Sequence, residues 1–458
     1  MVQIDFNRPS AVHFIGIGGI SMSGLAEVLI QRGFFVTGSD WRSSALTDHL
    51  AERGAKIYIG QESDHITPES GIIVYTAAIH PDNPEYVRAV ELGLPMMTRA
   101  ELLGQIMKNY ECAIAVSGTH GKTTTTSMVS EIFMAGEKDP TVSVGGILHS
   151  IGGNIRLGGT GTFITEACEY TNSFLSFYPT IAAVLNVRED HLDFFKDIHD
   201  IRHSFREFAK LLPQNGLLVI NGEIDEMEAL TEGLSCRVKT FGIRGEGLNY
   251  RAELHDEKRK NEFVIYRDNE RWCEVALRVP GEHNVLNALA AAAIADECGI
   301  SVRAIESALS EFTGAERRFE YKGEVNGATV IDDYAHHPDE IEATLTAAQK
   351  MKRGKLWCVF QPHTYTRTKA LLEEFADALC FADEIILAKI YAAREEDIYG
   401  VSSADIAARL QKKGKSVICF DTFDEIEDYL LHKLVHNDML ITMGAGDVVN
   451  IGEDLLHR

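Results

Sequence analysis

The chain has 458 residues, so we expect about two to four domains. Its composition, 45% hydrophobic and 24% charged, is typical of a soluble globular protein. The net charge of -24 excludes a non-specific nucleic-acid binder, which has to be basic. No apolar run reaches the ~18 residues of a membrane helix, the N-terminus lacks a signal-peptide pattern, and the eight cysteines include no C-x-x-C pair. We therefore expect a cytoplasmic protein without nucleic-acid or membrane partners.

The first hundred residues alternate between apolar runs and helical patterns. Residues 11–17, 34–40 and 71–75 predict strands, and residues 98–107 predict a helix that leads into a second domain. This alternation is typical of a Rossmann-like domain, which we place at residues 1–107.

A glycine-rich turn follows the first predicted strand. Gly16, Gly18 and Gly19 are similar to a dinucleotide fingerprint, and Asp40 lies about where an acidic ribose partner is expected. Because Ser21 replaces the third glycine, a diphosphate-bearing ligand fits as well as NAD. A tight turn without a ligand stays open as the alternative.

The strongest chemical signal follows the buried run at residues 112–116. The chain continues with Ser117-Gly118-Thr119-His120-Gly121-Lys122-Thr123-Thr124 and then with a helical pattern. Glycines let backbone N–H groups close on an anion, and a helix N-terminus adds partial positive charge. A lysine can reach the outer phosphates, and a threonine hydroxyl can bind Mg²⁺. Although Val116 replaces the first glycine of the usual motif, the sequence predicts a nucleoside triphosphate site.

Polar residues follow two further predicted strands, at 162–166 and 181–187. Glu166 ends the first, and Asp190 and His191 follow the second. Ligands collect at the carboxyl ends of parallel strands, so these groups are candidates for binding Mg²⁺ or its water. Cys168 is interpreted as a packing residue, since no pattern marks a base for it.

The rest of the central region, which we place at residues 108–313, contains both strands and helices. Residues 236–280 predict short strands in a small antiparallel sheet, and residues 284–298 and 303–312 predict helices.

The α/β alternation resumes in a third domain at residues 314–458. Strands are predicted at residues 329–332, 356–360, 384–387, 417–420 and 439–442. The pair Arg317-Arg318 at the start is a candidate phosphate clamp, because guanidinium groups match phosphate oxygens. A metal site of His336, His337 and His363 stays open, although helical H-x-x-x-H spacing is absent.

Seven segments in order carry a resemblance to one family. They are residues 15–28, 118–124, 190–191, 281–287, 317–319, 332–338 and 361–368. On these motifs the whole chain resembles the Mur ligases. The resemblance implies three α/β domains and an ATP- and Mg²⁺-dependent ligation of L-alanine to the lactyl carboxylate of UDP-N-acetylmuramate, through an acyl phosphate, in peptidoglycan precursor synthesis. It also implies small-molecule substrates only, in a monomer or weak homodimer.

The resemblance also implies roles for single residues. Lys122, Glu166 and His191 would be catalytic, and Thr123, Glu166 and His191 would hold magnesium. The ATP contacts would be Gly118, Thr119, His120, Gly121, Lys122, Thr123, Thr124, His283, Asn287, Arg317 and Arg318. UDP-N-acetylmuramate would lie on Gly16, Gly18, Gly19 and Asp40, and the amino acid on Tyr334, His336, His363 and Arg367.

Two positions depart from the family pattern. Cys168 stands where many relatives have Asp, and Thr364 stands where some have Arg, so neither is given a role. Three alternatives stay open: a sister ligase that attaches a preformed peptide, an NAD-dependent oxidoreductase, and a nucleotide-gated binding protein. The oxidoreductase would leave Lys122, Arg317 and the third domain without a function.

Overall fold

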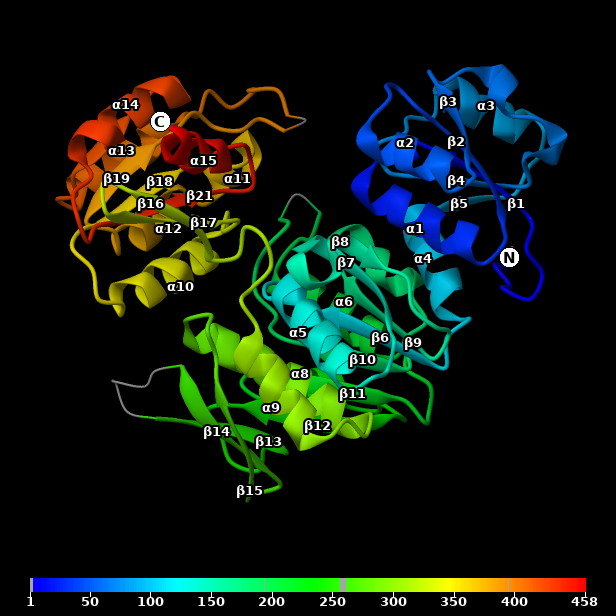
Figure 1. Ribbon diagram of the computed structural model, residues 1–458, viewed down its shortest axis with the longest axis horizontal. Helices are drawn as coiled ribbons and strands as arrows, with labels where there is room; N and C mark the ends of the chain where they lie inside the picture. Colours follow the sequence, from blue (N-terminus) through cyan, green and yellow to red (C-terminus); the bar gives the residue numbers. More distant parts are fainter. Residues whose placement is uncertain (1–2, 193, 256–260, 394) are drawn as a thin grey trace. The chain divides into compact units, whose positions relative to one another are not determined.

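The structure is a computed structural model that describes residues 3–192, 194–255, 261–393 and 395–458. These residues form two compact units. The first contains residues 1–252, 265–273 and 286–309, and the second contains residues 253–264, 274–285 and 310–458. Three β-sheets with flanking helices are found in the described residues, which confirms the α/β fold class (Figure 1).

The N-terminal sheet has the strand order β3-β2-β1-β4-β5 and parallel pairing throughout. Its order reverses between β1 and β4, and ligands of such sheets bind beyond the carboxyl ends of the strands at this point. The strands are β1 (Ala11–Ile15), β2 (Phe35–Asp40), β3 (Lys56–Ile59), β4 (Ile72–Tyr75) and β5 (Met96–Thr98). The helices are α1 (Ile20–Gln31), α2 (Ala45–Glu52), α3 (Pro84–Glu91) and α4 (Arg99–Met107), with short 3₁₀ turns η1 (Ser63–His65) and η2 (Pro68–Ser70).

The central sheet has the order β15-β14-β13-β12-β11-β10-β6-β9-β7-β8. Its strands are β6 (Cys112–Ser117), β7 (Thr141–Leu148), β8 (Gly153–Arg156), β9 (Thr162–Ala167), β10 (Ile181–Val184), β11 (Leu217–Asn221), β12 (Arg237–Gly242), β13 (Tyr250–Leu254), β14 (Glu262–Arg267) and β15 (Glu270–Ala276). The strands predicted within residues 236–280 are thus present, but they continue the central sheet, and β12 runs parallel to both β11 and β13.

Helices and 3₁₀ turns connect these strands. They are α5 (Lys122–Ala135), η3 (His149–Ile151), η4 (Tyr170–Ser176), α6 (Ile198–Ala209), α7 (Met227–Thr231), α8 (Glu282–Glu297) and α9 (Val302–Glu311). Helix α5 packs against β6, β7 and β9. Helix α6 and turn η4 share a core in which the ring of Phe174 stacks on Phe208 with centroids 4.6 Å apart. The strand that carries the phosphate loop is therefore fixed by packing in the middle of the sheet.

Helix α4 approaches η4 without a side chain between them. A Cβ atom on Gly104 would overlap the backbone oxygen of Ser176. The helix and the turn that follows Glu169 are consequently in backbone contact at this point.

The C-terminal sheet has the order β16-β17-β21-β18-β19-β20. In the described residues β16 pairs antiparallel with β17, and the other neighbouring strands pair parallel. The strands are β16 (Glu320–Val325), β17 (Ala328–Asp333), β18 (Leu356–Phe360), β19 (Glu384–Leu387), β20 (Val417–Cys419) and β21 (Met439–Met443). The five predicted strands are confirmed, and β16 was not predicted.

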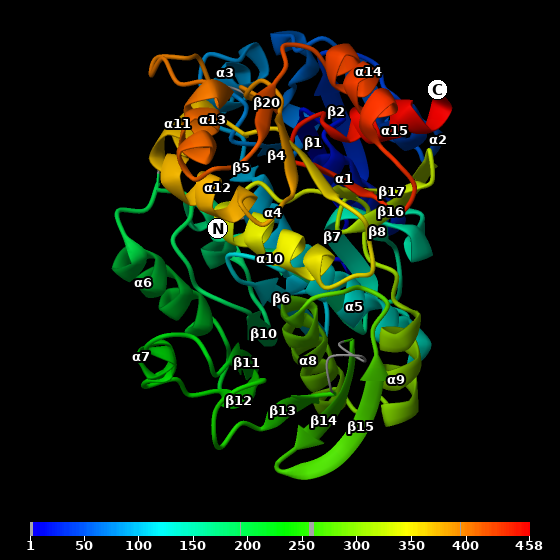
Figure 2. The ribbon, with the colours of Figure 1, turned by 90° about the vertical axis from the view of Figure 1, so that its left-hand side faces the viewer.

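Helices cover both faces of this sheet. Buried side chains of α10 (Pro338–Gln349), α12 (Leu372–Leu379) and α13 (Ser403–Lys412) form one core cluster, and those of α14 (Phe423–Lys433) and α15 (Val449–His457) form another. Figure 2 shows the two sets on opposite sides of the strands. The short helix α11 (Tyr365–Ala370) follows β18.

No helix in the described residues is both long and apolar enough to span a membrane.

Candidate active site

The phosphate loop has the backbone geometry that an anion site needs. Gly118 and Gly121 have φ angles of 148° and 85°, which side chains with a Cβ rarely adopt. Helix α5 begins at Lys122, directly after Gly121. The free N–H groups at this helix end can therefore bind a phosphate.

Asn186 holds the loop in this shape. Its side-chain oxygen accepts a hydrogen bond from His120 N at 2.8 Å, and its side-chain nitrogen donates to His120 O at 3.0 Å. Arg188 N donates to the Thr119 hydroxyl at 2.9 Å. These contacts hold Thr119 and His120, which follow β6, against the segment that follows β10.

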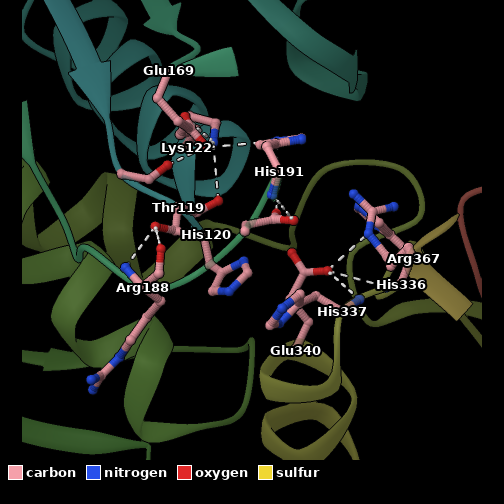
Figure 3. A network of polar contacts seen from close by, with 12 residues as sticks. Thr119, His120, Lys122, Glu169, Arg188, His191, His336, His337, Glu340 and Arg367 are labelled. Atoms are coloured by element: carbon pink, nitrogen blue, oxygen red, sulfur yellow. Dashed lines mark hydrogen bonds and ion pairs between the residues drawn. The ribbon is translucent and has the colours of Figure 1, made fainter. Parts of the chain in front are cut away.

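The Lys122 ammonium lies inside the loop (Figure 3). It donates to Gly118 O at 2.6 Å and Thr119 O at 3.0 Å, and to the two carboxylate oxygens of Glu169 at 2.9 and 3.2 Å. Burial on its own lowers the pKa of Lys122, but the charge of Glu169 opposes it, and the resulting pKa lies above the usual value. Lys122 is therefore fully charged at neutral pH.

Acidic groups lie beside the lysine at the carboxyl end of β9. Glu166 accepts a hydrogen bond from Gly145 N at 2.5 Å, and Glu169 is only 2% exposed. His191 Nε2 is 3.9 Å from Glu169 Oε1 and 3.7 Å from Asp190 Oδ2. Carboxylate oxygens are the ligands that Mg²⁺ prefers, so these side chains have the donor chemistry of a magnesium site. Their ligand atoms do not converge on one point in the described residues.

Cys168 lies between the two carboxylates in sequence. Burial raises the pKa of its thiol, and Glu169 adds to the rise. The thiol therefore stays protonated, which agrees with packing and not with a nucleophile.

The other predicted nucleotide residues of the first unit are near the loop. Thr123 is 7% exposed in the first turn of α5, and Thr124 follows it at an intermediate burial. A Cβ atom on Gly121 would lie 2.6 Å from the amide oxygen of Asn287, so this side chain packs directly on the loop. His283 lies one turn before Asn287 on α8, in the part of this helix that belongs to the second unit.

The predicted N-terminal ligand residues surround the end of β1. Gly16 has a φ of 82°, and Gly16 O accepts a hydrogen bond from Gly19 N in a tight turn. The Asp40 carboxylate accepts a hydrogen bond from Gly18 N at 2.8 Å. Asp40 thus fixes the turn in this structure, at the strand-order reversal where a diphosphate is expected.

Arg317 and Arg318, in the second unit, have different surroundings. Arg317 donates to Asp332 Oδ2 at 2.9 Å, to Gly444 O at 2.7 Å and to Gly446 O at 2.9 Å. Arg318 lies 3.8 Å from Glu340. The guanidinium of Arg317 is therefore bound within the C-terminal domain, and Arg318 is the better candidate for a phosphate clamp.

The four predicted amino-acid residues are brought together beyond β17 and β18. The rings of Tyr334 and His336 are 5.5 Å apart, those of His336 and His363 are 5.9 Å apart, and Arg367 Nη1 lies 3.4 Å from His363 Nδ1. Burial lowers the pKa of His363, and the charge of Arg367 lowers it further. His363 is consequently neutral at pH 7.

Two open questions on this domain are answered. Asp339 N donates to His337 Nδ1 in the first turn of α10, and the described clusters with converging ligand atoms do not combine His336, His337 and His363. The three-histidine metal site is therefore not supported. Thr364 caps α11, since its hydroxyl accepts a hydrogen bond from Arg367 N at 3.4 Å.

Models of three Mur ligase domains match successive parts of the chain. The "Mur ligase family, catalytic domain" model matches residues 11–111, the "Mur ligase middle domain" model residues 116–295, and the "Mur ligase, glutamate ligase domain" model residues 317–446. A protein of Lachnospira eligens, named UDP-N-acetylmuramate–L-alanine ligase, is 56% identical over 458 residues, which is 100% of both chains. The chain belongs to the Mur ligase family.

A second curated protein and two solved structures are also similar to this chain. A UDP-N-acetylmuramate–L-alanine ligase of Agathobacter rectalis is 55% identical over 459 residues, with 100% of both chains covered. The crystal structure of a UDP-N-acetylmuramate–alanine ligase from Thermotoga maritima aligns with a TM-score of 0.79 at 31% identity, over 98% of both chains. A murein peptide ligase from Psychrobacter arcticus aligns with a TM-score of 0.70 at 25% identity, also over 98% of both. The three-domain α/β fold of a Mur ligase is thereby confirmed.

Sequence analysis missed three residues of this Mur ligase site. Asn186, Glu169 and Gly145 contact the loop or its carboxylates from positions far away in the chain. Glu169 was visible only as an acidic residue shortly after a buried strand, and Asn186 as a polar residue at the end of another.

Gly145 gives a test of the carboxylate arrangement. A Cβ atom there would lie 2.8 Å from Glu166 Oε2, and one on Gly146 would lie 3.2 Å from Thr123 Cγ2. We expect Gly145→Ala to displace Glu166 and to raise the Mg²⁺ concentration for half-maximal activity about tenfold. Mg²⁺ titration of phosphate release checks this, with Gly161→Ala, at a glycine with open space around it, as the control. An unchanged magnesium requirement would show that Glu166 tolerates the added methyl group.

Proposed function

We propose that this chain joins L-alanine to the lactyl carboxylate of UDP-N-acetylmuramate at the expense of ATP. The proposal rests on the phosphate loop. Lys122, the α5 N-terminus and the carboxylates of Glu166 and Glu169 lie there at the carboxyl ends of the central strands β6 and β9. The names of the full-length relatives supply the substrates. The products would be UDP-N-acetylmuramyl-L-alanine, ADP and phosphate.

The central site would perform phosphoryl transfer mainly by position and charge. Lys122 would bind the γ-phosphate, and the loop amides from Gly118 to Thr124 would bind the β-phosphate. Thr123 and Glu166 would hold one Mg²⁺ and His191 a second, and these ions would supply positive charge to offset that of the phosphates. Asn287 and His283 would contact adenine. The lactyl carboxylate would attack the γ-phosphate, and the acyl phosphate would then be attacked by the amine.

The outer domains would hold the other substrates. Gly16, Gly18, Gly19 and Asp40 would bind the UDP part in domain 1–107. Tyr334, His336, His363 and Arg367 would bind L-alanine in domain 314–458. A neutral His363 beside a cationic Arg367 suits an amino acid, because Arg367 can pair with its carboxylate while the uncharged imidazole does not repel its ammonium group.

The setting of the proposed reaction follows from its substrates. UDP-N-acetylmuramate and ATP are cytoplasmic metabolites, so we place the enzyme in the cytoplasm, as a monomer or weak homodimer.

Phosphate release from ATP tests the proposal. With UDP-N-acetylmuramate and Mg²⁺ present, we expect release with L-alanine and about fivefold less with glycine, because a pocket that buries one methyl group gains roughly 1 kcal/mol from it. The readout is free phosphate, with product identity checked by mass spectrometry.

The same assay separates the alternatives. Release only with the tripeptide L-Ala-γ-D-Glu-diaminopimelate would place the chain with the murein peptide ligases, one of which shares its fold. Steady release from ATP alone would favour a nucleotide-gated protein and would contradict the proposed ligase.

A further inference from the structure

Glu169 binds the ammonium group of Lys122, which the proposed reaction needs for the γ-phosphate. An ammonium group has three protons, and those of Lys122 are taken by Gly118 O, Thr119 O and the Glu169 carboxylate. The side chains of Lys122 and Glu169 are only 16% and 3% exposed. In this conformation no proton of Lys122 is available for a phosphate oxygen.

Glu169 in turn depends on the lysine. Its carboxylate is buried, and in the described residues it lies 2.9 Å from Lys122 and 3.9 Å from His191. A buried carboxylate that loses its partner is strongly destabilised. Lys122 can therefore leave for a phosphate only if another cation takes its place.

A nucleotide without a divalent cation meets two obstacles here. Lys122 would have to abandon Glu169, and the phosphates would approach the negative charges of Glu169 and Glu166. A divalent cation on Glu169 removes both obstacles, since it replaces the ammonium and offsets the repulsion. Coupling of this kind is reciprocal, so the nucleotide also strengthens cation binding.

We propose that Glu169 is a positioning residue that holds Lys122 in the ligand-free enzyme and releases it to the nucleotide only when a divalent cation takes the carboxylate. The enzyme thereby selects the magnesium complex of the nucleotide over the free nucleotide. This proposal rests on the proposed use of ATP and is independent of the amino acid that is joined.

The test is equilibrium binding of a non-hydrolysable ATP analogue to the full chain by calorimetry, in EDTA and in saturating Mg²⁺. In Glu169→Gln the neutral amide no longer competes for the lysine. We expect its affinity for the analogue in EDTA to rise about tenfold, and the gain from Mg²⁺ to shrink by a similar factor.

Glu166→Gln is the matched control. Glu166 accepts a hydrogen bond from Gly145 N, whereas the hydrogen bonds of Lys122 in the described residues go to Gly118 O, Thr119 O and Glu169. In this variant Mg²⁺ should increase the affinity for the analogue less than in the wild type. Its affinity in EDTA should rise much less than that of Glu169→Gln. Affinity of Glu169→Gln in EDTA that is equal to or below that of the wild type would overturn the proposal.

A second measurement uses the wild type alone, in case Glu169→Gln does not fold. Acetylation of Lys122 is followed by mass spectrometry with and without Mg²⁺ and no nucleotide. Mg²⁺ should raise the labelling rate at Lys122 several-fold and leave that of the exposed Lys355 unchanged. Equal rates at Lys122 would contradict the exchange.

The two proposals fail in different ways. No binding of the analogue to the wild type, even with Mg²⁺, would refute the use of ATP and this inference with it. Tight Mg²⁺-dependent binding with an unchanged response in Glu169→Gln would refute the role of Glu169 alone.

Discussion

Replacing Lys122 with alanine should lower kcat/KM for phosphate release by about 10³-fold or more, because the γ-phosphate loses its positively charged side chain during transfer. The same change leaves Glu169 buried without its nearest cation. Breaking a buried ion pair costs about 3 kcal/mol, so the variant should also unfold at a lower temperature. Phosphate release and thermal unfolding by circular dichroism measure the two effects.

A double variant separates these effects. Lys122→Ala combined with Glu169→Gln removes the unpaired charge, so we expect most of the stability to return while the activity stays lost. Normal turnover in the single variant would contradict the assignment of the phosphate loop. If the double variant were as unstable as the single one, the buried pair would not be the source of the stability loss.

The second large effect is expected at Arg317. Burial raises the pKa of Asp332, whose side chain is fully buried, and the charge of Arg317 opposes this rise. Arg317→Ala removes that charge and three hydrogen bonds that join the linker to β17 and the loop after β21. We expect a loss of about 3 kcal/mol in the free energy of unfolding and a fall in Tm on the order of 10 °C, measured by calorimetry.

Arg318→Ala is the comparison for Arg317. Arg318 makes an ion pair with Glu340 at 3.8 Å, lies over the ring of Tyr334, and carries the charge that opposes the burial-raised pKa of Asp333. The Tm of Arg318→Ala should therefore fall, but by about 5 °C, less than that of Arg317→Ala, which also loses three hydrogen bonds. The kcat/KM of Arg318→Ala should fall about 100-fold if Arg318 clamps a phosphate. A stable Arg317→Ala variant together with an unstable Arg318→Ala variant would reverse the assignment of the two side chains.

The strands that sequence analysis predicted are those that read as apolar runs. Residues 112–116 and 356–360 lie in β6 and β18, whose residues are almost all buried. Strand β16 has the sequence EYKGEV and lies at the edge of its sheet, with Tyr321 62% exposed. A strand that buries so little surface leaves no apolar pattern, and it forms because β17 offers an unpaired edge.

Site residues that are far apart in the sequence could not be predicted. The loop from Gly118 to Thr124 is contiguous, so its motif is legible in the sequence. Glu169 is 47 residues from Lys122, and Asn186 is 66 residues from His120. Only the order of strands β10-β6-β9 in the sheet brings these residues to the loop, and no single sequence contains that order. The hydrogen bonds of Arg317 go to β17 and to the loop after β21, which are distant in sequence, so the sequence could not distinguish Arg317 from Arg318 as the candidate clamp.

The backbone contact between Gly104 and Ser176 has a consequence for how this protein can vary. Position 104 carries no chemistry, yet any residue other than glycine would push η4 away from α4. Turn η4 begins directly after Glu169, so the displacement would reach the buried carboxylate beside the phosphate loop. A residue of the first domain is thus restricted to glycine by the geometry of a site in the second domain. Substitutions at this position are therefore not neutral, although its neighbours in sequence give no sign of this.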